Sequence, residues 1–309
     1  MPTTFLPAVS ALRAAAEPTR LRLLALLARA ELTVGEICEV IGQSQPRVSR
    51  HLKLLCDAGL LDRFREQHWV YYRAPASAAE RGTVQQLLAL VREDDDLLRR
   101  DRKRMETVIR ERARRAADQL PAASRGSASG AVDSIILSEL AAEPIGVLLD
   151  VGTGSGHVLG LLAANATRAV GIDISSNALR LARTNVHGAG LSHCELQRGD
   201  MYDLPFAGPL FDTVTVDRVL ATAQRPSAAL TEIARTLKEG GRAVVIEDFD
   251  TLSSAGAANP IATLREWFAL AGLECQRLHP VDTEDAHLLV AVARRPAVGP
   301  TLVGRVASG

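Results

Sequence analysis

Residues 145–156 read IGVLLDVGTGSG, an apolar run that ends in an acid and is followed at once by a glycine-rich turn. A helical pattern over residues 158–164 comes directly after the turn. A buried strand, a glycine-rich turn and a helix N-terminus form the ligand cradle of a doubly wound α/β sheet, because glycines let a ligand approach the backbone closely. The stretch therefore predicts a Rossmann-like domain that binds a ligand at this turn.

The segments after the turn favour an adenosyl sulfonium over a dinucleotide as the ligand. The dinucleotide fingerprint would place a third glycine at His157. Strand 169–173 ends at Asp173, an acid placed to accept both ribose hydroxyls, which both ligand classes require. Residues 197–201, QRGDM, then end a further strand in an acid that suits the adenine amino group. This second acid favours the adenosyl sulfonium.

The ordered series of motifs over residues 131–295 resembles the class I S-adenosylmethionine-dependent methyltransferases. It continues with expected strands at 211–217 and 243–247 and a closing hairpin at 273–293. The resemblance implies that the glycines line the methionine part of S-adenosylmethionine or S-adenosylhomocysteine, that one acid binds ribose, and that another flanks the adenine. The residues predicted to bind this ligand are Asp150, Gly152, Thr153, Gly154, Gly156, Asp173, Ile174, Asp200, Met201 and Asp217.

The acceptor side of a methyl transfer is poorly represented in the sequence. Transfer needs an acceptor held in line with the methyl group, and a base or a shaped pocket to position it. Residues 217–224, DRVLATAQ, contain neither His nor an aromatic residue, and residues 118–144 contain no aromatic residue that could cover an acceptor. No catalytic residue is predicted. A non-enzymatic sensor is favoured, and an active methyltransferase stays open.

The N-terminal part predicts a winged helix-turn-helix. Glu17-Pro18-Thr19-Arg20 opens a helix, and Thr33-Val34-Gly35-Glu36 is a capping box for a second helix over residues 34–41. Gly42 ends that helix, and Ser44 is expected to cap the next one. Two short strands within residues 59–73 then make a hairpin.

Polar and basic side chains gather on the outer faces of the helix that begins at Ser44. When the N-terminal half of such a helix enters the major groove, Arg can pair with guanine and Gln with adenine. Side chains of the hairpin can add phosphate contacts, which carry no sequence information. The predicted DNA-binding residues are Ser44, Gln45, Arg47, Ser49, Arg50, Lys53, Arg65 and His68.

Residues 8–73 resemble the arsenic-repressor (ArsR) family of winged-helix regulators. The motifs that carry the resemblance are EPTRLRLL at 17–24 and QPRVSRHLKLLCDAGLL at 45–61. The resemblance implies a homodimer that binds a pseudo-palindromic double-stranded operator, often as a repressor released by a ligand. The Cys-x-Cys metal site of many members falls on Thr33 and Gly35, and residues 76–117 hold no His for the other familiar site. A metal-sensing regulator with a vestigial C-terminal domain is therefore disfavoured, and no metal ligand is predicted.

The expected fold class is an α+β winged helix-turn-helix joined to an α/β Rossmann-like methyltransferase domain. Residues 1–117 hold 21 Lys+Arg against 15 Asp+Glu, and residues 118–309 hold 15 against 21. A DNA-binding part joined to a small-molecule part would give this asymmetry. The predicted parts are a winged helix-turn-helix at 1–75, a long dimerisation helix at 76–117, a flexible linker at 118–130, a methyltransferase-like domain at 131–295 and a disordered tail at 296–309.

The sequence also predicts a cytoplasmic protein that does not engage a membrane. The N-terminus MPTTFLP lacks the charged and apolar regions of a signal peptide, and no apolar stretch is long enough to span a bilayer. The four cysteines are scattered and form no CxxC pair, so they are expected to be reduced.

The two halves together predict a DNA-binding regulator. Winged-helix regulators with this second domain resemble the S-adenosylhomocysteine-responsive repressors of methionine-cycle genes. That resemblance implies a dimeric repressor whose operator affinity is controlled by S-adenosylhomocysteine or S-adenosylmethionine. The alternative is a working methyltransferase of a small molecule with an appended DNA-binding domain.

Overall fold

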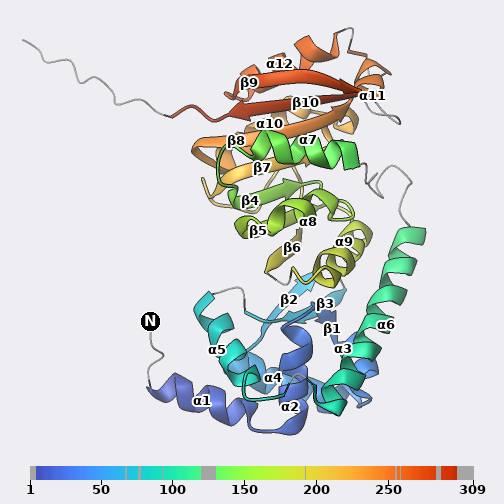
Figure 1. The fold of residues 1–309 in the computed structure, drawn as a ribbon, viewed down its shortest axis with the longest axis vertical. Coiled ribbons are helices and arrows are strands. Elements are labelled where there is room, and N and C mark those ends of the chain that lie inside the picture. The colour runs from blue at the N-terminus through green and yellow to red at the C-terminus, as the bar shows by residue number, and fades with distance from the viewer. Residues whose placement is uncertain are drawn as a thin grey trace, which may run out of the picture. The chain divides into compact units, whose positions relative to one another are not determined.

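The computed structural model of the chain describes residues 5–66, 68–75, 78–92, 94–119, 130–191, 193–254, 256–257, 259–282 and 287–297. Most of the predicted linker and tail, residues 120–129 and 298–309, lies outside these ranges. By their contacts the residues form two compact units. The first contains residues 1–127, 154–160 and 175–198, and the second contains residues 128–153, 161–174 and 199–309 (Figure 1).

The first unit contains the predicted winged helix-turn-helix. Its elements are α1 (Phe5–Ala15), α2 (Pro18–Leu27), β1 (Leu32–Thr33), α3 (Val34–Ile41), α4 (Gln45–Asp57), β2 (Asp62–Glu66) and β3 (Trp69–Arg73). Glu17 accepts the Arg20 N–H at 2.9 Å, which starts α2. The capping box at Thr33 and Glu36 is formed in both directions, and Gly42 ends α3 with a left-handed φ of 72°. These three helix boundaries agree with the predictions.

The start of α4 shows one wrong prediction. Ser44 is the N-cap residue, but its side chain makes no capping hydrogen bond. A capping hydroxyl would bond the second or third N–H of the helix. The second belongs to Pro46, which has none, and the third, that of Arg47, bonds to the Ser44 carbonyl oxygen at 3.1 Å.

The wing is a three-stranded sheet in the order β1-β3-β2, with antiparallel pairing. Phe64 on β2 faces Tyr71 on β3, and their rings stack with centroids 5.5 Å apart. Tyr71 is fully buried. The core beneath includes Leu24, Ile37 and Leu52, each 0% exposed. Tyr72 of β3 packs against this core, so the hairpin is held on the helices by apolar packing.

The predicted single helix over residues 76–117 is wrong, because the structure has two helices there. They are α5 (Ala78–Leu88) and α6 (Asp96–Asp118). The Asp95 side chain accepts the N–H groups of Leu97 and Leu98 at 2.9 and 3.2 Å, which caps a new helix. Arg92 pairs with Asp94 just before the cap.

Two elements distant in sequence belong to the same unit. They are α9 (Ser176–Gly188), whose N-cap Ser175 accepts the Ala178 N–H, and β6 (Cys194–Arg198). Ala178 and Leu181 of α9 pack with Ala116 of α6. The glycine-rich turn at residues 154–156 and the start of α8 (His157–Ala163) are also part of this unit.

The sheet of the second unit follows the order β5-β4-β7-β8-β10-β9. β4 pairs with β5 and β7, and β7 with β8, all in parallel, whereas β10 is antiparallel to both β8 and β9. This arrangement confirms the Rossmann-like fold and the closing hairpin, whose turn at 283–286 is not described. The strands are β4 (Gly146–Val151), β5 (Ala166–Asp173), β7 (Phe211–Asp217), β8 (Leu237–Asp248), β9 (Glu274–Asp282) and β10 (His287–Arg294).

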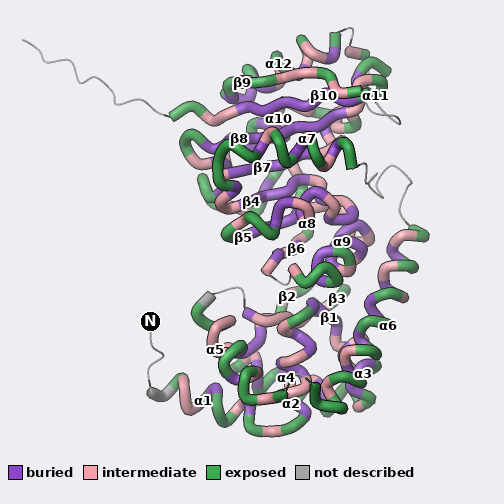
Figure 2. The backbone as a smooth tube through the Cα atoms, in the orientation of Figure 1, coloured by how far each residue is buried: buried purple, intermediate pink, exposed green. Residues whose placement is uncertain are grey.

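Helices accompany these strands in the second unit. They are α7 (Gly130–Leu140), α10 (Pro226–Thr236), α11 (Phe249–Ser254), α12 (Pro260–Leu270) and the 3-10 turn η2 (Leu220–Thr222). The inner strands are buried along most of their length (Figure 2), as expected for parallel strands covered on both faces. No helix in the described ranges is both long and apolar enough to cross a membrane.

Candidate DNA-binding helix and cofactor site

Helix α4 presents the predicted recognition residues on its outer face. Gln45, Arg47, Arg50 and Lys53 are exposed, as is the N-cap residue Ser44. Ser49 is half-buried. The inner face is made of Val48, Leu52 and Leu55, which are 0% exposed and belong to the core. The apolar stripe therefore fixes which side of the helix can meet DNA.

The basic side chains on this face are available to a ligand. Within the described ranges no side chain pairs with those of Arg47, Arg50 or Lys53. A neighbour on the same helix differs, since the His51 ring lies 3.6 Å from the Glu17 carboxylate. Arg65 on β2 and His68 in the hairpin turn are exposed. A long helix face with unpaired cations next to an exposed hairpin suits phosphate and base contacts.

Asp150 organises the predicted cofactor turn from inside the fold. It is 2% exposed at the carboxyl end of β4. Its two carboxylate oxygens accept hydroxyl hydrogen bonds from Thr153 and Thr215, each at 2.6 Å. Burial raises the pKa of Asp150 to about 6, against the opposing effect of the two hydroxyls. Both oxygens accept hydroxyl groups of the protein, and this bonding holds the turn after β4 in place.

Gly152 and Thr153 lie against the neighbouring strand. Their N–H groups donate to the Ile172 carbonyl oxygen at 2.8 and 2.9 Å. Gly152 has a φ of 71°, and a Cβ at this position would lie 2.4 Å from Val219 Cγ2. Only glycine fits here, because a side chain would be both strained and obstructed. The turn thus keeps a bare backbone where the predicted ligand approaches.

The ribose and adenine residues are brought together by a backbone contact. Asp173 and Ile174 follow β5, and the Gly199 N–H donates to the Asp173 carbonyl oxygen at 3.1 Å. Asp200 and Met201 come directly after Gly199. Asp200 is exposed and accepts the Tyr202 N–H at 3.0 Å, and Ile174 is 61% exposed. Four predicted residues therefore share one edge of the sheet.

Asp217 ends β7 and is engaged by its neighbour. Both of its carboxylate oxygens accept from the Arg218 guanidinium, at 2.9 Å each. Arg218 has a φ of 54°, the one positive value recorded for a residue other than glycine in the described chain. The pair lies at the carboxyl end of a strand beside β4, so it faces the same edge as Asp150 and Gly152.

Glu247 is a site residue that the sequence analysis missed. It is 0% exposed near the end of β8 and accepts the N–H groups of Val219, Leu220 and Ala221 at 3.0, 2.6 and 3.3 Å. Burial raises the pKa of Glu247 to about 7. The available signal was an acid that directly continues the apolar run at 243–246. Its carboxylate holds the loop that limits the space around Gly152.

Gly154 and Gly156 are described with the first unit. Both have left-handed φ values, 52° and 77°. A Cβ on Gly156 would lie 3.0 Å from side-chain atoms of Ala182 and Val186 on α9. The amide nitrogen of Asn185 donates to the Ser155 carbonyl oxygen at 2.9 Å. This part of the glycine-rich turn is therefore packed directly on α9.

These residues fit an adenosyl ligand by two features of the protein itself. The turn after β4 cannot carry a side chain at Gly152, and the strand beside it ends in an acid at Asp173. Gly152 would lie along the methionine part and Asp173 would accept the ribose hydroxyls. Such a ligand supplies either a methyl group for transfer or a binding signal. Among the described residues, no group of three His, Cys, Asp or Glu side chains could hold a metal ion.

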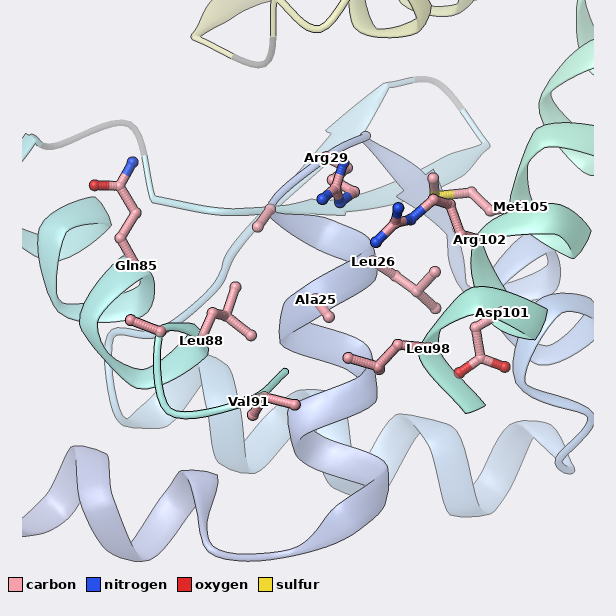
Figure 3. A pocket seen from close by; sticks show the side chains of 12 residues that line it. Ala25, Leu26, Arg29, Gln85, Leu88, Val91, Leu98, Asp101, Arg102 and Met105 are labelled. Carbon is pink, nitrogen blue, oxygen red and sulfur yellow. The ribbon is translucent and has the colours of Figure 1, made fainter. Parts of the chain in front are cut away.

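A separate cavity of about 510 Å³ lies among α2, α5 and α6 in the first unit (Figure 3). Leu26, Leu88, Leu98 and Met105 form much of its wall, and Arg29 and Arg102 point to its rim. None of the residues predicted to bind DNA or cofactor lines it.

Comparisons with known proteins match two separate stretches of the chain. Residues 17–63 match the model of the arsR family of bacterial regulatory proteins, and residues 149–245 match that of a methyltransferase domain. The arsenical resistance operon repressor of Escherichia coli (strain K12) is 40% identical over 82 residues, which are 25% of this chain and 70% of that repressor.

Relatives of the second part are matched over less of their length. A demethylmenaquinone methyltransferase of Clavibacter sepedonicus is 36% identical over 100 residues, 32% of this chain and 40% of that enzyme. An uncharacterised 37.1 kDa transposon protein of Streptomyces fradiae is 37% identical over 124 residues, 39% of this chain and 35% of that protein. The chain thus spans well under half the length of these two relatives. It belongs to the arsR family of bacterial regulatory proteins and carries a class I methyltransferase domain in addition to the DNA-binding helix-turn-helix of that family.

Proposed function

We propose that the protein is a dimeric transcriptional repressor whose operator affinity is set by S-adenosylhomocysteine or S-adenosylmethionine bound at residues 150–217. A ligand can shift DNA binding only by its different affinity for the DNA-binding and the released state. The proposal therefore requires that a ligand in the cofactor site changes the position or the order of α4 or of the wing.

The observation that carries this proposal is the way the polar groups near the expected methyl position are used. Asp217 is paired with Arg218, and Glu247 accepts three backbone N–H groups. A general base must be free to take a proton from an acceptor. These carboxylates serve the fold instead, which favours a sensor over an enzyme.

Calorimetry with both adenosyl compounds tests the proposal. The purified protein is titrated with each, and its affinity for a DNA duplex selected by the protein from a random pool is measured with and without each compound. We expect binding of S-adenosylhomocysteine and a change of about tenfold in DNA affinity, within the usual range of coupling between two sites. If neither compound binds, the site is not an adenosyl site.

A working methyltransferase is the second candidate, and the methyltransferase relatives favour it equally. Transfer of a labelled methyl group from S-adenosylmethionine to small molecules of a cell extract would support it. The matched control is the Gly152→Ala variant, in which the cofactor turn is obstructed. Label above that control would overturn the proposal of a sensor without activity.

The homodimer is supported by apolar side chains left in solvent around α1, α5 and α6. Leu12 is 56% exposed, Leu90 is 81% exposed and Leu97 is 44% exposed. Residues of α5 and α6 also line the cavity of Figure 3. Covering these side chains with a partner copy would remove apolar surface from water, which is favourable. We expect a dimer mass by light scattering, and a Leu97→Glu variant should shift it toward the monomer.

Replacing Arg50 with alanine is expected to weaken DNA binding by about 10- to 100-fold, the cost of one base contact. Arg50 is exposed on α4 and unpaired within the described residues, so its loss should leave the fold intact. Fluorescence anisotropy with the selected duplex measures the change. Arg99→Ala, on an exposed stretch of α6, is the control. Equal losses in both variants would contradict recognition by α4.

A further inference from the structure

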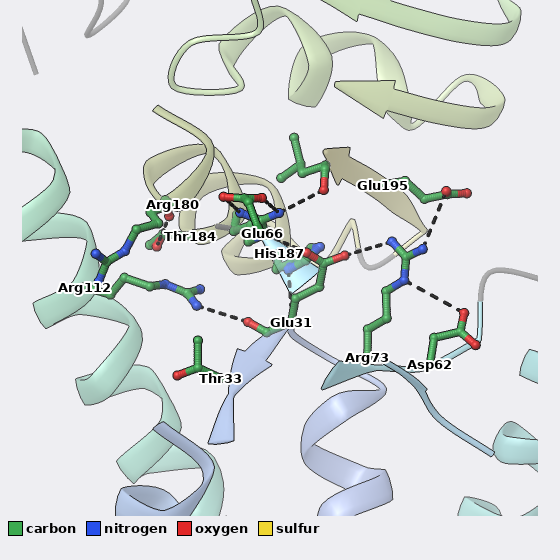
Figure 4. A network of polar contacts seen from close by, with 12 residues as sticks. Glu31, Thr33, Asp62, Glu66, Arg73, Arg112, Arg180, Thr184, His187 and Glu195 are labelled. Carbon is green, nitrogen blue, oxygen red and sulfur yellow. Dashed lines mark hydrogen bonds and ion pairs between the residues drawn. The ribbon is translucent and has the colours of Figure 1, made fainter. Parts of the chain in front are cut away.

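Arg183 of α9 belongs to a buried ion cluster, since it bonds to the carboxylates of Glu31 and Glu66, which Figure 4 labels. Its side chain is 0% exposed. Nε donates to Glu31 at 2.7 Å, and Nη2 donates to Glu66 at 2.7 Å and to the Leu196 carbonyl oxygen at 2.9 Å. The side chains of Glu31 and Glu66 are 3% and 4% exposed. One guanidinium thus joins two carboxylates that are both removed from water.

The two carboxylates belong to the strands of the wing or lie directly beside them. Glu66 is the last residue of β2, and Glu31 precedes β1. Arg73, the last residue of β3, donates to the other oxygen of Glu31 at 3.0 Å. The Arg183 guanidinium also lies 4.4 Å from the centre of the Tyr71 ring on β3. Arg183 therefore contacts groups at both strands of the hairpin that carries Arg65 and His68.

Glu31 is bonded through every polar group that it has. Its N–H donates to His187 Nδ1 of α9 at 3.3 Å, and its carbonyl oxygen accepts from Arg112 of α6 at 3.0 Å. Burial alone would raise the pKa of the Glu31 carboxyl, but the charges of Arg183 and Arg73 hold it below its usual value. Burial lowers the pKa of His187, which suits its role as an acceptor. Any displacement of α9 must therefore disturb Glu31.

The opposite contacts of α9 reach the cofactor turn. Asn185 donates to the Ser155 carbonyl oxygen, and Gly156 lies so close to Ala182 that no side chain fits between them without a shift. The helix also starts three residues after Asp173, the predicted ribose ligand. A ligand that orders residues 154–156 thus acts on an element that is bonded to the wing.

Stability alone is a weak reason for such a cluster. Burying ions costs several kcal/mol each, and well-packed apolar side chains of similar size are often as stabilising as a buried ion pair. Buried ionic groups do specify one arrangement among several in some proteins. A cluster with fixed forks and fixed partners can transmit a small displacement, because it has few alternative geometries.

We propose that Arg183 is a positioning residue that couples the cofactor turn to the wing. This role rests on the proposed function, since it explains how the ligand alters DNA binding. Ligand contact with residues 154–156 fixes the position of α9, and the Arg183 guanidinium holds Glu31 and Glu66 in the matching position. The wing and its exposed Arg65 and His68 are thereby held in one orientation.

The test replaces the whole cluster by apolar side chains of similar length, Arg183→Met with Glu31→Met and Glu66→Met. No buried charge of the trio is then left alone. The affinity for S-adenosylhomocysteine and the affinity of the ligand-free protein for the selected duplex should each stay within about threefold of the unmodified protein. The effect of the ligand on DNA affinity should fall from about tenfold to about one. If the cluster only stabilised the fold, its replacement would not abolish the effect of the ligand on DNA affinity while the affinities for ligand and for DNA both persist.

A control variant removes a more exposed ion pair in the second unit. Lys238 and Asp212, 2.8 Å apart, lie where β8 and β7 begin, and Lys238→Met with Asp212→Asn should keep the full ligand effect. Loss of the effect in both variants would overturn the assignment to Arg183. If the unmodified protein shows no ligand effect, the proposed function itself fails, and that outcome is distinct from an effect that survives in the triple variant.

Amide hydrogen exchange is a second, independent measurement. It needs no DNA, and it tests the proposal even if the triple variant does not fold. S-adenosylhomocysteine should slow amide exchange in residues 62–66 and 69–73 of the unmodified protein. Arg183→Lys keeps the charge but loses the planar fork that bonds two carboxylates, so this protection should fall. Equal protection in both proteins would overturn the proposal.

Discussion

Replacing Gly152 with alanine is expected to raise the dissociation constant for S-adenosylhomocysteine by about 100-fold. The left-handed φ of 71° costs a side chain about 1–2 kcal/mol, and the new Cβ would lie 2.4 Å from Val219. Val219 cannot easily move aside, because its N–H is bonded to Glu247. The turn must shift instead, and every 1.4 kcal/mol of lost binding is a factor of ten. Calorimetric titration measures the change.

The same substitution at Gly160 provides the control. Gly160 lies within α8 with no atom within 4 Å of its would-be Cβ, and alanine favours a helix over glycine. Gly160→Ala should therefore bind the ligand normally and be at least as stable as the unmodified protein. If the two alanine variants bind the ligand equally well, the ligand does not approach the turn at Gly152.

Replacing Arg183 alone with leucine is expected to destabilise the first unit by about 3–5 kcal/mol. The change leaves Glu31 and Glu66 buried without their shared cation, and an uncompensated buried charge is far more costly than a missing pair. Urea denaturation followed by the fluorescence of Trp69 and Trp267 measures the loss. The triple methionine variant should be much more stable than this single variant, because it removes the stranded carboxylates as well.

An exposed arginine offers the comparison. Arg92 pairs with Asp94, but its side chain is 84% exposed, so Arg92→Leu should leave the denaturation midpoint unchanged. A midpoint for Arg183→Leu as high as that of Arg92→Leu would show that water reaches Glu31 and Glu66.

The features that the sequence predicted well are local ones. The capping box at Thr33 and Glu36 spans three positions, and the turn at Gly152 follows its strand directly, so each can be recognised without the rest of the chain. The break between α5 and α6 is also local but was missed. Val91 and Leu98 are seven positions apart, so helical apolar spacing continues across the break, but the side-chain cap by Asp95 outweighs that pattern.

The features that could not be predicted depend on distant residues. Arg183 is 152 positions from Glu31 and 117 from Glu66. Each of these charges alone has the pattern of an ordinary solvated residue, because only the folded chain brings opposite charges together and excludes water from them. The different neighbours of the two glycines could not be predicted for the same reason. Gly152 lies against Val219, whereas Gly156 lies against α9.

The packing of α9 has a consequence for the design of fragments and chimaeras of such regulators. A fragment that stops at residue 119 keeps Glu31 and Glu66 but lacks Arg183, His187 and the surface of α9 that covers α6. Its acidic pair would be left to water or to Arg73 and Arg112. The DNA-binding part therefore does not end at the linker, because its buried charges need partners from α9. A DNA-binding module exchanged between two proteins of this architecture must travel with a matching basic residue from the other side of the linker.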